Sequence, residues 1–296
     1  MIFYVDGEWV PEEQAVMPVL DFGFMYGDGC FESIAVAEGK VLDLDRRIER
    51  LLRSAKMLRL DPALSESELR GLMLETASRN GMADVANGWI RPMLSRGVNP
   101  LGLGNASRSG VLRILAKAVA REPSIYRGPI AVTTAILSTY ARATPAILDP
   151  RIKASSYTPS TLAIFEANDR GADHAIMRDA NGFITEAATA NVFCVSEGRL
   201  FTPALAGVLG GLTRRRMIDA ARTIGVECVE TNLTRYDFET ADEAFVTAAM
   251  TCVAAIGSFE GSPIAEAPGP VTTALRDAYV ESAFADATPV PSTAGV

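Results

Sequence analysis

Asp149-Pro150-Arg151-Ile152-Lys153-Ala154-Ser155-Ser156-Tyr157 is the stretch of this sequence with the clearest chemical character. Its lysine is followed by small residues, which leave room for a flat ring to approach the amine. A lysine that forms a Schiff base must lose its proton near neutral pH, which requires a partly desolvated site or a nearby positive charge. On these residues alone, an ordinary surface lysine remains the simpler interpretation, so the other lysines must be compared.

The chain has only three other lysines, Lys40, Lys56 and Lys117. Lys40 follows a glycine in an expected hairpin, and Lys56 lies on the polar face of an expected amphipathic helix, so both should be solvated. Lys117 lies near the end of an expected strand. Lys153 differs from these three by its small neighbours, but the residues alone do not give it a covalent role.

Length, composition and charge limit the class of protein. The 296 residues, 48% of them hydrophobic, are enough for one or two domains. A net charge of −8 argues against nucleic acid as a partner, because that affinity comes mainly from clustered Lys and Arg. No apolar run reaches the ~20 residues that cross a bilayer, and Asp6 comes too early for a signal peptide. We expect a soluble, cytoplasmic protein that binds neither nucleic acid nor membrane.

Cysteine and histidine usage excludes several kinds of site. Cys30, Cys194, Cys228 and Cys252 are far apart and form no CxxC pair, so reduced core thiols are expected instead of a disulfide framework or a zinc site. The single histidine, His174, leaves serine-hydrolase and zinc-hydrolase mechanisms without their usual base or ligand. No metal site is predicted.

Hydrophobic spacing predicts a mixture of strands and helices. Asp45 is a candidate N-cap, and Ser65 with Glu68 forms a candidate capping box. Strands are expected at 1–10, 31–36, 40–44, 89–95, 110–118, 130–137, 175–178, 190–195, 200–201 and 244–247, and helices at 46–60, 65–80, 160–168, 213–224 and 270–284. Because the strands come in runs instead of alternating with helices, the pattern favours an α+β fold.

Three further features stand in a fixed order along the chain. The lysine stretch is followed by a helix ending in Glu166-Ala167-Asn168, then by Gly182-Phe183-Ile184-Thr185-Glu186 leading into 190–193, then by Leu209-Gly210-Gly211-Leu212-Thr213-Arg214. This order resembles class IV, or fold type IV, aminotransferases, the pyridoxal-5′-phosphate-dependent branched-chain and D-amino-acid aminotransferase family. The likeness extends from Phe3 to about Phe284, and it implies a two-domain fold with the cofactor at the domain interface.

Composition along the chain indicates a domain division, with Glu122-Pro123 in a linker and a tail rich in Pro, Ser, Thr and Ala. We expect a small N-terminal α+β domain at 1–121, an interdomain linker at 122–128, a larger C-terminal cofactor-binding domain at 129–284, and a flexible tail at 285–296.

The resemblance gives roles to the residues around the cofactor. Lys153 is the Schiff-base lysine and the catalytic base, and Glu186 faces the pyridine nitrogen, which a carboxylate would keep protonated. Leu212 and Thr213, at the start of the helix expected at 213–224, offer backbone N–H groups to the phosphate, and the crowding of Arg214, Arg215 and Arg216 there favours an anion. The remaining cofactor-binding residues are Arg59, Tyr157, Asn191, Gly211, Leu212, Thr213, Ala248 and Ala249.

Substrate recognition is expected from Tyr26, Phe31, Trp89, Arg91 and Met250. The Trp89–Pro92 segment resembles that of branched-chain enzymes, and Arg91 can meet the distal carboxylate of glutamate. The stretch Arg96–Gly102 lacks the Arg-x-His carboxylate trap of D-amino-acid aminotransferases. The turn at 247–252 departs from the family, because Ala249 has no hydroxyl for the phosphate, a loss of ~1–2 kcal/mol, and Met250 would crowd the substrate carboxylate.

The sequence therefore predicts a homodimeric aminotransferase that takes a branched-chain-like amino donor and a keto-acid acceptor, with glutamate and 2-oxoglutarate as one pair, in a ping-pong reaction. Three alternatives remain open. They are D-amino-acid or (R)-amine transamination, an aminodeoxychorismate lyase reaction that eliminates pyruvate, and a non-catalytic relic that only binds the cofactor.

Overall fold

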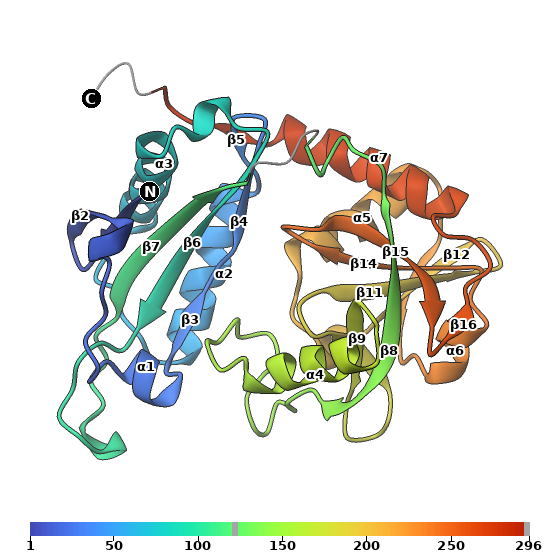
Figure 1. The fold of residues 1–296 in the computed structure, drawn as a ribbon, viewed down its shortest axis with the longest axis horizontal. Helices are drawn as coiled ribbons and strands as arrows, with labels where there is room; N and C mark the ends of the chain where they lie inside the picture. The colour runs from blue at the N-terminus through green and yellow to red at the C-terminus, as the bar shows by residue number, and fades with distance from the viewer. Residues whose placement is uncertain (120–123, 293–296) are drawn as a thin grey trace. The chain divides into compact units, whose positions relative to one another are not determined.

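The computed structural model describes residues 1–119 and 124–292, and the chain forms two compact units (Figure 1). The first unit comprises Met1–Arg127, Ile152–Ser156 and Phe284–Val296, and the second comprises Gly128–Arg151 and Tyr157–Ala283. Five residues around Lys153 thus belong to the first unit although the chain on both sides belongs to the second. Residues 122 and 123 of the expected linker lie outside the described residues.

The first unit is built on an eight-stranded sheet in the order β17-β5-β4-β6-β7-β1-β2, with β3 paired to β6. Its strands are β1 (Ile2–Val5), β2 (Glu8–Pro11), β3 (Gly29–Phe31), β4 (Ile34–Ala37), β5 (Lys40–Val41), β6 (Asn87–Ser95), β7 (Val111–Ala118) and β17 (Thr288–Pro289). Its helices are α1 (Phe22–Tyr26), α2 (Leu44–Met57) and α3 (Glu66–Arg79).

Local sequence explains how α2 and α3 begin and where they pack. The predicted capping box is confirmed, because Ser65 Oγ accepts from the Glu68 N–H and Glu68 Oε2 accepts from the Ser65 N–H. The prediction of Asp45 as an N-cap is wrong, since α2 begins at Leu44 after Asp43, and Asp45 lies in the first turn. The apolar faces of both helices are buried in one core with Ile90 of β6 and Ile114 of β7.

The end of the chain is more ordered than its composition suggests. Thr288 and Pro289 pair with Val41 and Lys40 of β5, and Val290 is buried in the core of the first unit. A proline is compatible with this position because β17 is an edge strand. The expectation of a flexible tail is therefore not met by residues 285–292, and residues 293–296 lie outside the described residues.

The second unit is built on a nine-stranded sheet in the order β10-β9-β8-β15-β14-β11-β12-β13, with β16 paired to β15. Its strands are β8 (Ala131–Ala141), β9 (His174–Arg178), β10 (Ile184–Ala187), β11 (Asn191–Ser196), β12 (Arg199–Pro203), β13 (Cys228–Thr231), β14 (Glu243–Ala248), β15 (Cys252–Phe259) and β16 (Ser262–Pro263). Its helices are α4 (Thr158–Asp169), α5 (Leu212–Thr223), α6 (Arg235–Glu239) and α7 (Pro270–Ala285). Most strand pairs are antiparallel, so the predicted α+β class is confirmed.

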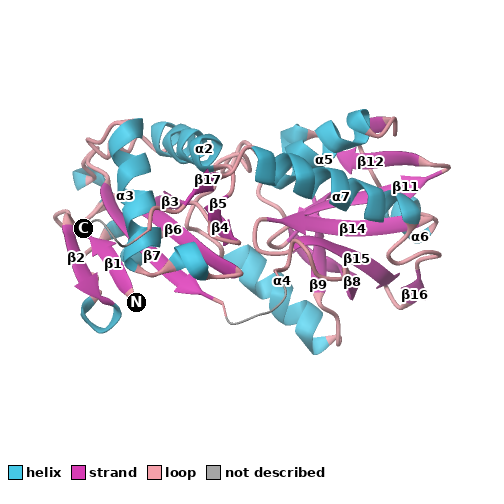
Figure 2. Cartoon of the chain, turned by 90° about the horizontal axis from the view of Figure 1, so that it is seen from above, coloured by secondary structure: helices cyan, strands magenta, loops and turns pink. Residues whose placement is uncertain are grey.

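The two faces of this second sheet have different neighbours. Val192 and Val246 point into a core shared with Ile256. Their immediate neighbours in the sequence, Phe193 and Phe245, point to the opposite face and stack on each other with ring centroids 5.0 Å apart. Helices α5 and α7 lie across that opposite face (Figure 2). The alternation along β14 therefore decides which of its side chains face α5.

Candidate active site

The lysine stretch is fixed in the first unit by backbone pairing with β3. The Phe31 N–H donates to the Lys153 carbonyl at 3.0 Å, and the Ser155 N–H donates to the Gly29 carbonyl at 2.8 Å. The Lys153 N–H also donates to Ser54 Oγ at 3.2 Å. Gly29 is required where β3 approaches β6, since a Cβ there would lie 2.4 Å from the Leu94 carbonyl oxygen. Strand β3, which ends at Phe31, thus positions the backbone of the lysine.

Three of the predicted substrate residues gather around the lysine side chain. Lys153 Nζ lies 4.5 Å from the centroid of the Phe31 ring. The Arg91 guanidinium lies 5.1 Å from the same ring and 5.2 Å from the Trp89 ring, and its Nη2 donates to Ser33 Oγ at 3.3 Å. We call Lys153, Phe31, Trp89 and Arg91 the lysine cluster. It combines two aromatic faces with two cations.

A buried carboxylate next to this cluster was missed by the sequence analysis. Glu32 is fully buried and receives Arg50 Nε at 2.6 Å, Arg50 Nη2 at 2.8 Å and Arg47 Nη1 at 3.5 Å. Burial raises the pKa of Glu32, but the charges of Arg50, Arg47 and Lys153 outweigh it and hold the pKa below its usual value. An ionised carboxylate therefore lies directly after Phe31.

Tyr26 and Arg59 lie at the C-terminal ends of α1 and α2. Tyr26 ends α1, is partly exposed, and packs edge-on against Phe22 at 5.0 Å. Arg59 is exposed, with φ of 57°, just beyond the end of α2.

Arg96 has a structural role in the segment 96–102, which corresponds to the Arg-x-His motif that binds the substrate carboxylate in D-amino-acid aminotransferases. Its guanidinium binds the Asp28 carboxylate and donates to the carbonyl oxygens of Leu58 and Ser107. The side chain is only 9% exposed. The guanidinium is thus occupied by groups of the protein.

In the second unit, Glu186 is surrounded by donors. Its Oε1 lies 2.7 Å from Arg142 Nε, and its Oε2 accepts from Asn191 Nδ2 at 2.9 Å and from the Leu209 N–H at 3.1 Å. Glu186 is 4% exposed, so these interactions take the place of water. Arg142 was missed by the sequence analysis because no motif marks an arginine at the end of β8.

The predicted phosphate turn is joined to this carboxylate through Asn191. Asn191 Nδ2 also donates to the Leu209 carbonyl at 3.0 Å, and a Cβ on Gly211 would lie 1.9 Å from Asn191 Oδ1. Only glycine fits at this position. Gly211 is the N-cap of α5, no side chain caps this helix within the described residues, and Thr213 is buried in its first turn. Glu186, Asn191 and Gly211 thus lie together in the second unit.

The arginines at the start of α5 do not support the argument for an anion. Arg214 Nη2 binds Glu230 and the Pro203 carbonyl, and Arg216 donates to the Ser282 carbonyl. Arg215 is exposed, with Asp219 at 4.0 Å. Each of these guanidinium groups thus has an acid or a carbonyl of the chain beside it, so the crowding of charge reveals nothing about a ligand.

The remaining predicted residues lie at chain turns. Ala248 ends β14, and Ala249 and Met250 form the turn to β15. Tyr157 directly precedes α4, and its carbonyl accepts from the Thr161 N–H. Thr247, just before the turn, is 1% exposed, and its hydroxyl has no hydrogen-bond partner among the described residues.

These residues fit pyridoxal 5′-phosphate. The buried Glu186 carboxylate, with Arg142, Asn191 and the Leu209 N–H around it, suits a protonated ring nitrogen. The start of α5, where only glycine fits at position 211, suits a phosphate. In the part of the chain that the structure describes, no group of His, Cys, Asp and Glu could hold a metal ion, and no helix is long and apolar enough to cross a membrane.

Comparison with known sequences identifies relatives over nearly the whole chain. Residues 29–259 match the family Amino-transferase class IV. A protein of Methanocaldococcus jannaschii is 34% identical over 281 residues, which cover 94% of this chain and 95% of that protein. The branched-chain-amino-acid aminotransferase of Pseudomonas aeruginosa is 30% identical, over 95% of this chain and 92% of the relative.

Solved structures agree with the sequence relatives. The branched-chain aminotransferase of Thermoproteus uzoniensis, crystallised with norvaline, superposes with a TM-score of 0.90 at 31% identity, covering 98% of this chain and 99% of the other. The T.th. branched-chain amino acid aminotransferase, complexed with N-(5′-phosphopyridoxyl)-L-glutamate, gives 0.89 at 27% identity and covers 98% of both chains. With the family match over residues 29–259, this places the chain in the class IV aminotransferase family.

Proposed function

We propose that this aminotransferase uses pyridoxal 5′-phosphate to exchange an amino group between a branched-chain amino acid and 2-oxoglutarate. The lysine cluster carries the proposal, because it places the Arg91 guanidinium against the Phe31 and Trp89 rings, and the Lys153 amine against the same Phe31 ring. The aromatic faces suit an apolar side chain, and the guanidinium suits a distal carboxylate. The relatives support it, since solved branched-chain enzymes carry norvaline or phosphopyridoxyl-glutamate.

Each proposed cofactor contact has a named residue. Lys153 holds the cofactor covalently, Glu186 holds the ring nitrogen, and the start of α5 at Leu212 and Thr213 offers backbone N–H groups to the phosphate. Arg59, Tyr157, Ala248 and Ala249 remain proposed contacts. When bound, pyridoxal phosphate supplies a protonated ring that accepts electron density from the substrate α-carbon.

The protein's own groups then handle charge and protons. Arg142, Asn191 and the Leu209 N–H stabilise the ionised form of Glu186, so a proton shared with that carboxylate remains on its partner. Once released from the cofactor, the Lys153 amine would move a proton from the substrate α-carbon to the C4′ carbon of the cofactor in the first half-reaction, and in the reverse direction in the second. Glu32, ionised beside Arg47 and Arg50, provides a fixed negative charge near that amine.

Turnover with a panel of donors tests the proposed function. We expect the yellow holoenzyme to be bleached by L-leucine and by L-glutamate, and 2-oxoglutarate to restore its colour. Preferential bleaching by D-alanine or by an (R)-aryl amine would replace the proposal with the D-amino-acid or (R)-amine reaction. Pyruvate release from aminodeoxychorismate would indicate the lyase. A colour that no donor changes would indicate a relic that only binds the cofactor.

Arg91→Met is expected to separate the two substrates. Loss of a charge-assisted hydrogen bond should lower kcat/KM for glutamate and 2-oxoglutarate by roughly 10–100-fold, because the distal carboxylate loses its partner. Leucine should be spared, since methionine keeps the apolar contacts with Phe31 and Trp89. Steady-state kinetics of both half-reactions provide the measurement.

The matched control for this variant is Arg199→Met, which removes a guanidinium stacked on Phe201 in the second unit, 5.4 Å from the ring centroid. This control should have the same kcat/KM as the wild type for both leucine and glutamate. Equal losses for leucine and glutamate in a well-folded Arg91→Met would show that Arg91 does not bind the acidic side chain. Failure of the wild type to use glutamate at all would remove the branched-chain assignment itself.

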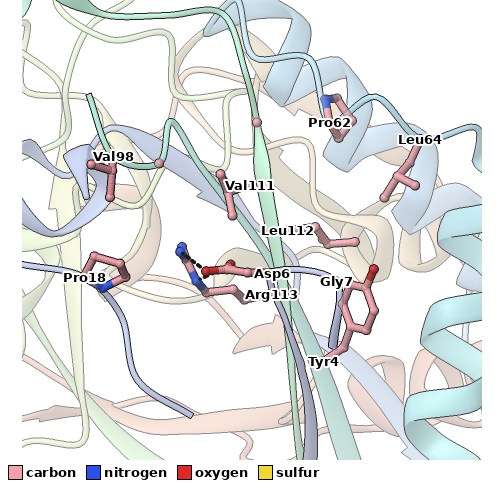
Figure 3. Close-up of a pocket in the computed structure, with 12 residues that line it drawn as sticks. Tyr4, Asp6, Gly7, Pro18, Pro62, Leu64, Val98, Val111, Leu112 and Arg113 are labelled. Carbon is pink, nitrogen blue, oxygen red and sulfur yellow. Dashed lines mark hydrogen bonds and ion pairs between the residues drawn. The ribbon is translucent and has the colours of Figure 1, made fainter. Parts of the chain in front are cut away.

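We also propose a homodimer formed through an apolar surface of the first unit. The segments 16–26 and 98–103 expose Val16, Met17, Val19, Leu20, Phe24, Tyr26, Val98, Leu101 and Leu103. The two segments are adjacent, since the Phe22 N–H donates to the Gly97 carbonyl and Asp21 pairs with Val98. Pro18 and Val98 also border a hollow of about 520 Å³ that reaches to Tyr4 and Leu64 (Figure 3). A continuous surface with this many exposed apolar side chains is typical of an interface between protein chains.

Light scattering at assay concentration is expected to give twice the chain mass of 31.6 kDa. Phe24→Asp with Val98→Asp should yield monomer, because two charges would be buried without partners at the interface. Tyr236→Asp, at an equally exposed aromatic residue of α6, should remain dimeric. A fully active wild-type monomer would contradict the proposal.

The proposed location is the cytoplasm, where reduced thiols are usual. All four cysteines are free. Three are buried, and burial raises the pKa of the Cys30 thiol to about 12, so it stays protonated and unreactive.

A further inference from the structure

The hydroxyl of Thr247 is an unexplained polar group in the second unit. Thr247 is 1% exposed, and its Oγ1 has no hydrogen-bond partner among the residues that the structure describes. Buried polar groups are nearly always hydrogen-bonded, because an unpaired one has lost its water without compensation. Where such a hydroxyl also lies beside a candidate binding site, it is a candidate donor to a ligand.

Strand register shows which way this hydroxyl faces. In the antiparallel pair of β11 and β14, Thr247 lies directly opposite Asn191, and opposed residues point to the same face. Alternation gives the same answer, since Phe245 and Phe193, two residues away on each strand, stack on each other on the face covered by α5 and α7 (Figure 2). Thr247 and Asn191 therefore share the helix-covered face.

The start of α5 lies against the helix-covered face of the sheet at the level of Asn191 and Thr247. The Asn191 side chain contacts Gly211, the N-cap of α5, so closely that a Cβ there would lie 1.9 Å from Asn191 Oδ1. Thr247 is the cross-strand neighbour of this asparagine. The hydroxyl is thus placed beside the first turn of α5, where backbone N–H groups favour an anion.

The opposite end of the same strand provides a contrast. Glu243, four residues before Thr247 and on the same face, accepts from the Val271 N–H at 2.9 Å and from the Thr272 N–H at 2.7 Å at the start of α7. The strand therefore supplies a carboxylate to one helix start. At the other it supplies only a hydroxyl, which can donate to an anion but brings no negative charge of its own.

We propose that the Thr247 hydroxyl donates a hydrogen bond to the phosphate of pyridoxal 5′-phosphate at the start of α5. It would take over the contact that Ala249 cannot make, because Ala249 has no hydroxyl. The inference rests on the proposed cofactor. It explains how a chain that departs from the family in this turn retains a side-chain donor for the phosphate.

The dissociation constants of pyridoxal 5′-phosphate and of pyridoxal, titrated into the apoprotein, test this assignment. Thr247→Val should weaken binding of the phosphorylated form by roughly 10-fold, since a hydrogen bond to a charged group is lost, and should leave pyridoxal unchanged. Thr247→Ser, which restores the hydroxyl, should bind both as the wild type does. Thr272→Val is the matched control, because that threonine is equally buried and its hydroxyl is equally without a partner among the described residues.

The ratio of the two dissociation constants is compared within each variant, so a general loss of stability cancels. If Thr247→Val folds poorly, Thr247→Ala provides the same comparison. A ratio equal to that of the wild type in the hydroxyl-free variants would overturn the assignment. Failure of the proposed cofactor is distinguishable, because the wild type would then bind neither compound.

The melting temperature gives a second test, in which Thr247→Val should have opposite effects without and with the cofactor. If the hydroxyl serves only the phosphate, Thr247→Val should melt no lower than the wild type without cofactor, since valine keeps the shape and removes an unpaired polar group. The same variant should gain less than the wild type when pyridoxal 5′-phosphate is added. A lower melting temperature of the apoprotein variant would show that the hydroxyl stabilises the fold itself.

Discussion

Lys153→Ala is expected to abolish covalent attachment of the cofactor and to reduce transamination by on the order of 10⁴–10⁶-fold, the scale of losses when a covalent nucleophile is removed. The reason is structural, because Lys153 is the lysine whose amine lies against the Phe31 ring and whose backbone is fixed to β3. Borohydride reduction of the holoenzyme, followed by peptide mass spectrometry, should place the label on Lys153 in the wild type and nowhere in the variant.

Lys117→Ala is the control for this experiment, since Lys117 is an exposed residue of β7 paired with Trp89. It should keep both the label and the activity. A label on Lys40, Lys56 or Lys117 would show that the covalent lysine has been misassigned. The fold of each variant is checked by its melting temperature.

Glu186→Gln is expected to leave the cofactor bound but to slow each half-reaction by roughly 10²–10³-fold, as when one electrostatic group is removed from other active sites. A neutral amide cannot keep a ring nitrogen protonated, and it leaves the Arg142 guanidinium, 2.7 Å away, without its ionic partner. Single-turnover absorbance with L-leucine measures the loss directly, separately from product release.

Glu260→Gln is the matched control, because it removes a partly buried carboxylate paired with Arg170 at 3.0 Å elsewhere in the second unit. Its single-turnover rate should equal that of the wild type. An unchanged rate in a well-folded Glu186→Gln would mean that the ring nitrogen is held by another group.

Capping residues and hydrophobic spacing in the sequence predicted the longer helices, because the backbone hydrogen bonds of a helix join residues close in sequence. The capping box at Ser65 places the start of α3, and helical spacing predicts α5 and α7 nearly to their ends. Strand β15 was missed because its alanines and glycine, CVAAIGSF, carry little strand preference. Its place in the sheet comes from pairing with β8 and β14, which a local pattern does not reveal.

The candidate site was predictable where one segment carries its own chemistry and not where distant segments combine. Glu186, Asn191 and Gly211 are predicted from short motifs, and the structure joins them through hydrogen bonds. Arg142 and Glu32 were missed, because their importance arises from partners that only the fold brings near. Likewise, the unpaired hydroxyl of Thr247 is recognisable only once its burial is known.

The composition of the first unit from three separate stretches of chain has a consequence for biosynthesis. Its sheet includes β17 at residues 288–289, and β3 pairs with residues that follow position 150. During synthesis on the ribosome, the earlier strands of this unit must therefore wait, with edges of their sheet unpaired, until residues 288–289 have emerged. The first unit is thus completed only after the residues of the second unit have been made, and we expect chaperones that recognise nascent chains to bind it during that interval.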